Sequence, residues 1–289
     1  MFAQYSETAP LRRVIIGRCE GYRAQPDYEE IVNEEQKKGL PTEAELRPEF
    51  AAFRKALQAE GVEVLVPDYV GKMVYDQLTP RDIGMAIGKR FLICNMARAS
   101  RRYEVAGVFP HILQEDGPEP NILIPPRPDM LMEGGDLIVH NGTLFVGLSQ
   151  RTNEAGLKYL KGTFGSEFDV QPIHCKALSE GENVLHLDCT FNPVGRRHCL
   201  IYPEGFREIP ALIREQYEWI AVTKEEQAAL GTNVLSVNEE TVISRKHPAC
   251  ARVNDALRTA GLRVIEVPFD GAPATGGSFR CCSLPLQRG

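Results

Sequence analysis

Residues 135–149, GDLIVHNGTLFVGLS, hold two apolar runs separated by Asn141-Gly142. Asn-Gly between two such runs is a strong signal for a two-residue β-hairpin, because both residues tolerate positive φ. A polar, helix-like segment (RTNEAGLKYLKGTF) follows, and then a third apolar run (FDVQPI). The stretch therefore predicts a small unit made of a hairpin, a helix and a third strand.

Four other parts of the chain repeat this order of strands and helix. In the first and the last unit the apolar helix residues share one face, and Gly61 or Gly261 stands where the helix should end. The residues on these faces are Leu46, Phe50, Phe53 and Leu57 in the first unit, and Val253, Ala256, Leu257 and Ala260 in the last. The repeat predicts five similar α/β units.

Five such units predict a ring, a five-bladed pseudo-symmetric α/β propeller that spans residues 1–289 as a single domain. Each small sheet would carry a helix on its outer face, and closure would remove exposed strand edges. The run at residues 276–286 would complete the first blade. Polar residues 20–45 and 114–120 are expected to form surface loops. An open α/β sheet would show the same alternation and stays an alternative.

Composition excludes several classes of protein. The net charge of −6 over 289 residues argues against a nucleic-acid partner. No segment approaches the roughly 18 apolar residues of a membrane span, so a cytoplasmic protein with no membrane partner is expected. The eight cysteines contain no CxxC pair, which indicates neither a disulfide framework nor a zinc ribbon. A homo-oligomer is possible.

Three segments carry residues suited to chemistry. Residues 276–286, GGSFRCCSLPL, place Cys281 and Cys282 after two glycines, which suits either a buried strand or a nucleophile presented at a strand mouth. The segment MEGGDLIV places Asp136 at the start of an apolar strand, although such an acid can also be a simple turn former. In VLHLDCTF, His186 and Asp188 stand two apart in a β-like run, so both should emerge on one face.

A solvated strand face would show the same spacing as His186 and Asp188. The combination is more telling, because a thiol, an imidazole and two carboxylates at strand ends are what nucleophilic attack on a small cation requires.

The motifs EGGD, GLSQRTN, HLDCTFNP and the GGSFRC tail resemble those of the guanidino-group modifying enzymes. These are arginine deiminase, dimethylarginine dimethylaminohydrolase and the arginine:glycine amidinotransferases, and the resemblance covers nearly the whole chain. It implies the five-bladed α/β propeller of that family, the pentein fold. It also implies Cys281 as nucleophile, His186 as general acid and base, and Asp136 and Asp188 as holders of the guanidinium.

The resemblance further implies substrate-binding roles for Asp82, Arg98, Arg151 and Glu133, and the two arginines match positions that grip the substrate carboxylate in the dimethylarginine hydrolases. It implies a small guanidino compound as partner and neither cofactor nor metal. Arg280 stands where deiminases and amidinotransferases usually have histidine. Asp188 favours an unmethylated guanidine, because the dimethylarginine hydrolases do not usually carry this acid.

The expected activity is hydrolysis of an arginine-like guanidine, of arginine deiminase or dihydrolase type, through a thiouronium on Cys281. An amidinotransferase that passes the amidino group to an amine is the alternative. A non-catalytic binding protein on the same fold is a third possibility, but it would not need this set of side chains.

Overall fold

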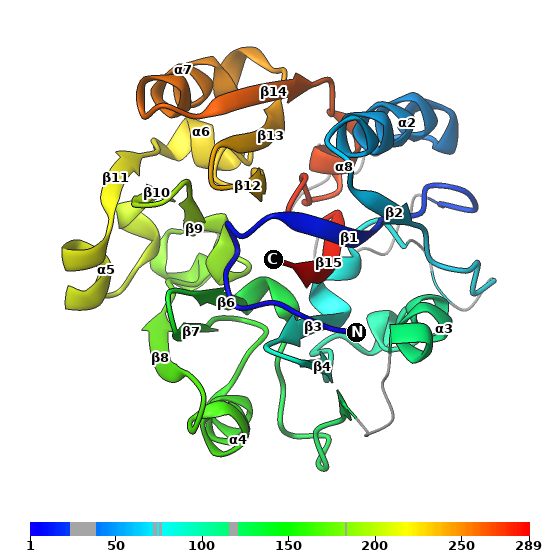
Figure 1. Ribbon diagram of the computed structural model, residues 1–289, viewed down its shortest axis with the longest axis vertical. Helices are drawn as coiled ribbons and strands as arrows, with labels where there is room; N and C mark the ends of the chain where they lie inside the picture. The colour runs from blue at the N-terminus through cyan, green and yellow to red at the C-terminus, as the bar shows by residue number, and fades with distance from the viewer. Residues whose placement is uncertain (24–38, 72–73, 75–76, 116–120, 183) are drawn as a thin grey trace.

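The computed structural model describes residues 1–23, 39–71, 74, 77–115, 121–182 and 184–289, and it forms a ring of five three-stranded sheets (Figure 1). In each sheet the inner strand is antiparallel to the middle strand, and the middle strand is parallel to the outer one. The predicted five-bladed α/β propeller is confirmed. Of the two expected surface loops, residues 24–38 and 116–120 lie outside the described residues.

The strands follow one scheme in all five blades. The inner strands are β15 (Ser283–Arg288), β3 (Gly84–Ile87), β6 (Leu137–His140), β9 (Phe191–Val194) and β12 (Leu235–Asn238). The middle strands are β1 (Leu11–Ile16), β4 (Arg90–Ile93), β7 (Thr143–Leu148), β10 (His198–Ile201) and β13 (Thr241–Arg245). The outer strands are β2 (Glu63–Leu65), β5 (Ile122–Leu123), β8 (Asp169–His174), β11 (Glu218–Ala221) and β14 (Arg263–Val267).

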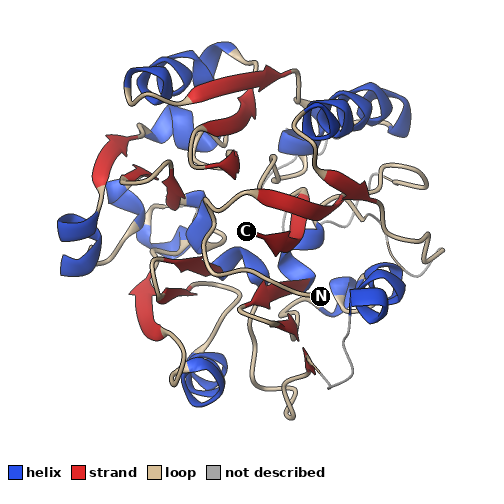
Figure 2. Cartoon of the chain, viewed as in Figure 1, coloured by secondary structure: helices blue, strands red, loops and turns tan. Residues whose placement is uncertain are grey.

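One helix precedes each outer strand and lies at the rim of the ring (Figures 1 and 2). These helices are α2 (Glu43–Ala59), α3 (Val105–Glu115), α4 (Glu154–Phe164), α5 (Ala211–Gln216) and α7 (Ala251–Thr259), with α6 (Lys224–Ala228) and α8 (Gly271–Ala274) in addition. Short 3₁₀ turns are η1 (Pro80–Ile83), η2 (Ala99–Arg101), η3 (Gly134–Asp136), η4 (Leu178–Glu180), η5 (Leu187–Cys189), η6 (Pro203–Gly205) and η7 (Pro248–Cys250).

The local signals in the sequence account for several of these elements. Asn141 and Gly142 have φ values of 50° and 74° and form the predicted hairpin turn between β6 and β7. The predicted apolar face of α2 is buried, and each such side chain contributes about 1.5–3 kcal/mol by leaving water. A capping box joins Thr42 and Glu45 at the start of this helix, which fixes where it begins.

The ring is closed by the two ends of the described chain. Strand β15 pairs with β1, with Leu11 opposite Arg288 and Ile16 opposite Ser283. The expectation that residues 276–286 complete the first blade is therefore confirmed. Among the described residues, no helix has both the length and the apolar character needed to cross a bilayer.

One local prediction was wrong. His186 and Asp188 do not belong to a strand: His186 is the extended residue before η5, and Asp188 lies inside that 3₁₀ turn. The reason is a tertiary contact, because the backbone N–H of Leu187 donates to Oδ1 of Asp136 at 2.9 Å instead of joining a ladder. The strand begins later, at Phe191.

Candidate active site

The blades share a common start, and this is where the candidate residues gather. Each inner strand is preceded within three residues by a polar side chain, and these five are Asp82, Asp136, Asp188, Asn233 and Cys281. Contacts between blades bring them to one end of the ring axis. The N–H of Arg81 donates to the carbonyl of Cys281 at 3.2 Å, which joins the second blade to the first.

Cys281 is buried and held by Asn233. The N–H of Cys281 donates to Oδ1 of Asn233 and Nδ2 of Asn233 donates to Sγ of Cys281, both at 3.1 Å. Sγ also lies 3.9 Å from Oδ2 of Asp188. Burial, and then the carboxylates of Asp188 and Asp82, raise the pKa of Cys281 well above its usual range. The thiol is therefore neutral until a cation offsets these carboxylates.

Cys282 differs from its neighbour. It is fully buried and packs in an apolar cluster with Phe53, Phe269 and Phe279. Cys281 contacts the polar side chains of Asn233 and Asp188.

His186 lies between carboxylates. Its Nε2 is 2.8 Å from Oε2 of Glu133, and its Nδ1 is 3.7 Å from Oδ1 of Asp82. Burial alone would lower the pKa of His186, but Asp82, Glu133 and Asp136 outweigh it and raise the pKa to about 10. The ring is consequently an imidazolium at neutral pH, able to donate a proton.

The same three side chains have the geometry of a possible metal site. One ligand atom each from Asp82, Glu133 and His186 lie within 4.8 Å of one another. A metal binds the neutral imidazole and would therefore compete with the proton that these carboxylates favour on His186. Ion pairing with the imidazolium accounts for the cluster.

Asp136 has both carboxylate oxygens engaged. Oδ2 accepts from the hydroxyls of Ser149 at 2.6 Å and Thr152 at 2.7 Å, while Oδ1 accepts from the N–H of Leu187. Burial raises the pKa of Asp136 to about 6 against the opposing effects of His186 and these hydrogen bonds. The contacts fix the segment that carries His186.

The carboxylates of Asp82 and Asp188 can accept further hydrogen bonds at the axis. Oδ2 of Asp82 accepts from Arg101 at 2.7 Å, but its Oδ1 is buried and accepts no hydrogen bond from the described residues. Asp188 is fully buried beside Cys281, and Nε of Arg280 lies 3.3 Å from its Oδ2. Two such carboxylates can receive the N–H groups of a planar cation.

The two expected carboxylate-gripping arginines occupy different settings. Arg151 is buried, with Nη1 3.9 Å from Oε1 of Glu133. Arg98 is half-buried at the residue before η2. Arg101, three residues further on, is the arginine that binds Asp82 and Glu104.

Sequence reasoning missed Arg101 and Asn233. A signal for Asn233 existed, because it precedes the inner strand of the fifth unit as Cys281 precedes that of the first.

In the EGGD segment, Gly135 is packed so closely against neighbouring side chains that there is no room for a Cβ atom. A Cβ on Gly135 would lie 2.7 Å from Cγ of His186 and 3.0 Å from Oδ1 of Asp82. Neither neighbour can retreat, because both are buried at the axis.

Gly135→Ala is therefore expected to displace His186 and lower both the melting temperature and the binding of any ligand of the axis. Gly162→Ala is the matched control, because a Cβ there meets nothing within 4 Å inside α4. Replacing a helix-interior glycine by alanine should stabilise the protein by about 0.5–1 kcal/mol. Thermal unfolding of both variants checks this, and similar shifts would contradict it.

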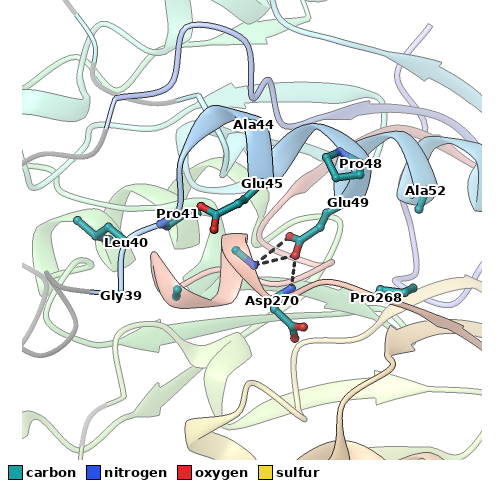
Figure 3. Close-up of a pocket in the computed structure, with 12 residues that line it drawn as sticks. Gly39, Leu40, Pro41, Ala44, Glu45, Pro48, Glu49, Ala52, Pro268 and Asp270 are labelled. Atoms are coloured by element: carbon teal, nitrogen blue, oxygen red, sulfur yellow. Dashed lines mark hydrogen bonds between the residues drawn. The ribbon is translucent and has the colours of Figure 1, made fainter.

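A separate hollow of about 880 Å³ lies between α2 and α8, outside the cluster described above (Figure 3). Its side chain Glu49 points toward α8 and accepts from the backbone N–H groups of Asp270 and Gly271 at 2.8–3.0 Å. Glu49 thereby anchors the start of the segment that leads to Cys281.

Comparisons place the chain among known proteins. Residues 23–288 match the family model described as N,N dimethylarginine dimethylhydrolase, eukaryotic. The uncharacterized protein YkgA of Bacillus subtilis (strain 168) is 31% identical, with 98% of this chain and 94% of that protein covered. The L-arginine:L-lysine amidinotransferase of Pseudomonas savastanoi pv. phaseolicola is 21% identical, with 84% and 78% covered.

Among solved structures, the amidinotransferase SxtG of Microseira wollei is similar, with a TM-score of 0.85 and 21% identity over 99% of this chain and 97% of that one. At this identity the likeness shows a shared fold.

Proposed function

This chain belongs to the N,N dimethylarginine dimethylhydrolase family and thus to the guanidino-modifying enzymes of the pentein fold, and from this premise we propose that it hydrolyses an arginine-like guanidine. The observation that carries the proposal is the position of Cys281, whose Sγ lies between Asn233 and Asp188 at the axis. Residues 1–289 would act as one catalytic domain.

The guanidinium of the substrate would pair with Asp82 and Asp188. Both carboxylates accept N–H donors, and Asp188 lies beside Sγ, so this pairing brings the central carbon to sulfur. Pairing with two carboxylates requires N–H groups on both sides of the cation, and an unmethylated guanidine provides them. Asp136, whose oxygens are already engaged, acts in this proposal as a positioning residue for His186 instead of a guanidinium holder.

The chemistry then follows from the charges. The bound cation lowers the pKa of Cys281, the thiol loses its proton to water, and the thiolate attacks the central carbon. His186 gives its proton to the departing amine, which leaves a thiouronium on sulfur. The neutral imidazole next takes a proton from water, and the resulting hydroxide attacks the thiouronium carbon. The C–S bond then breaks, which returns the thiolate of Cys281 and releases a ureido product such as citrulline. Arg98 and Arg151 stay proposed contacts for a substrate carboxylate.

An amidinotransferase is the second candidate. It is supported by the similarity of the segment LHLDCTFNPVG to that branch and by the L-arginine:L-lysine amidinotransferase relative. The two reactions differ only in whether water or an amine attacks the thiouronium.

Incubation with arginine alone distinguishes the two reactions. A hydrolase releases ammonia and forms citrulline, or ornithine if a second hydrolysis follows, and added glycine or lysine leaves the rate unchanged. Ornithine that forms only when an amine is added, with no ammonia, would replace the hydrolase by the transferase. The Cys281→Ser variant is the control for turnover that does not depend on the site.

The pH profile of kcat/KM tests the role given to His186. Glu133→Gln removes a carboxylate that holds the pKa of His186 near 10, so this pKa should fall. Because the proton donor must be charged, the alkaline limb of the profile should move to lower pH by roughly one to three units. An alkaline limb that stays in place would show that His186 is not the acid.

A further inference from the structure

Three arginines are fully buried along the ring axis, and one glutamate lies among them. Arg81, Arg280 and Arg288 are all buried, and Glu7 lies between them with 1% of its surface exposed. Burial would raise the pKa of Glu7, but the three arginines outweigh it and lower the pKa to about 2. Glu7 is therefore a negative charge at neutral pH among these buried arginines.

Glu7 reaches this position because the segment before β1 crosses the ring. The N–H of Ala3 donates to Leu286 of the first blade, Gln4 exchanges two backbone hydrogen bonds with Gly88 of the second, and the N–H of Glu7 donates to Val139 of the third. Figure 1 shows this dark blue segment running from the N-terminus past β6 to β1.

Arg280 links Glu7 to the active site. Its Nη1 and Nη2 donate to the two oxygens of Glu7 at 2.7 and 3.1 Å, which is a bidentate pair. Its remaining nitrogen, Nε, lies 3.3 Å from Oδ2 of Asp188. The same carboxylate oxygen of Asp188 lies 3.9 Å from Sγ of Cys281. One buried guanidinium thus stands between the carboxylate of the N-terminal segment and the carboxylate beside the thiol.

We propose that Glu7 is a positioning residue for substrate binding: it holds the Nη1 and Nη2 groups of Arg280, so that only Nε faces Asp188 and Asp188 can pair with a cationic guanidine. This inference rests on the proposed function. An arginine fork binds one carboxylate with two parallel N–H groups, and here Glu7 occupies that fork. Without the charge of Glu7, the Nη1 and Nη2 groups of Arg280 would turn to Asp188, the other nearby carboxylate. Arg280 would then compete with the guanidinium of the substrate for Asp188.

The test is steady-state kinetics of Glu7→Gln, which keeps the shape of the side chain and removes its charge. KM for the guanidine should rise about ten-fold or more, the size of one lost charged contact, while kcat at saturation changes less than about three-fold. Glu7→Asp retains the charge and should raise KM less than Glu7→Gln does. A KM within two-fold of the parent in Glu7→Gln would overturn the proposal.

Ser6→Ala is the matched control for mere loosening of the segment. Ser6 bonds Nδ1 of His140 at 2.8 Å, so its loss should lower the melting temperature with KM unchanged. If Ser6→Ala raised KM as much as Glu7→Gln, the effect would belong to the segment and the proposal would be overturned.

A rescue experiment covers the case in which Glu7→Gln folds poorly. The double variant Glu7→Gln with Arg280→Gln removes the competing guanidinium together with its partner, so KM should return toward the parent value. A double variant with KM as high as that of the single one would overturn the proposal. A parent protein that turns over no guanidine at all would instead sink the proposed function, so the two failures are distinct.

Discussion

Cys281→Ser is expected to lower kcat by at least about 10³-fold, because a serine hydroxyl is far less ionised and less nucleophilic than a thiol. Cys282→Ser should keep most of the activity, since its side chain packs in the apolar cluster behind the axis. Steady-state rates of both variants measure the difference. Intact-mass analysis of the parent stopped during turnover should show an adduct, and mass analysis of its digest should place that adduct on the peptide that contains Cys281.

Cys282→Ser is the matched control for Cys281→Ser, because it makes the same change at the adjacent thiol. A hydroxyl at Cys282 introduces a buried polar group and should cost about 1–3 kcal/mol of stability, so melting temperatures are recorded first. Equal loss of kcat in two well-folded variants would contradict the assignment of Cys281.

Asp188→Asn is expected to lower kcat/KM by roughly 10²–10⁴-fold, the kinetic equivalent of breaking a buried ion pair worth about 3–5 kcal/mol. The amide keeps the shape of the side chain but presents no negative charge to the substrate or to Arg280. Isothermal calorimetry of arginine with the Cys281→Ser variant, with and without Asp188→Asn, separates binding from chemistry.

Asp255→Asn makes the same chemical change on an exposed side chain of α7 that pairs with Arg258, and it should leave kcat/KM unchanged. If the Cys281→Ser variant bound arginine equally well with and without Asp188→Asn, another group would hold the guanidinium.

The ring could be predicted because its signals are local. Asn141-Gly142, the apolar face of α2 and the repeated order of strands all act over a few residues, so each unit could be recognised before any tertiary contact was known. Cys281 and His186 stood out for a different reason, because their segments resemble known motifs.

Other parts of the site could not be predicted from local signals. The turn at Asp188 was mistaken for a strand, since alternation over three residues does not distinguish the two and the deciding bond comes from Asp136. Asn233 belongs to none of the quoted motifs, and its place before an inner strand stands out only when the five units are aligned. Glu7 acquires its role only when residues more than 270 positions apart meet, as its pair with Arg280 shows.

The pairing of β1 with β15 makes the active site depend on a late step of folding. These strands are joined across almost the whole described chain, so the first blade has a high contact order and must wait for the slowest encounter in folding. Until β15 arrives, β1 presents an unpaired edge on which chaperones or other nascent chains could add a strand. The same arrival delivers Cys281. In refolding experiments, activity should therefore recover with the last kinetic phase, and activity that recovered ahead of that phase would show that β15 docks early.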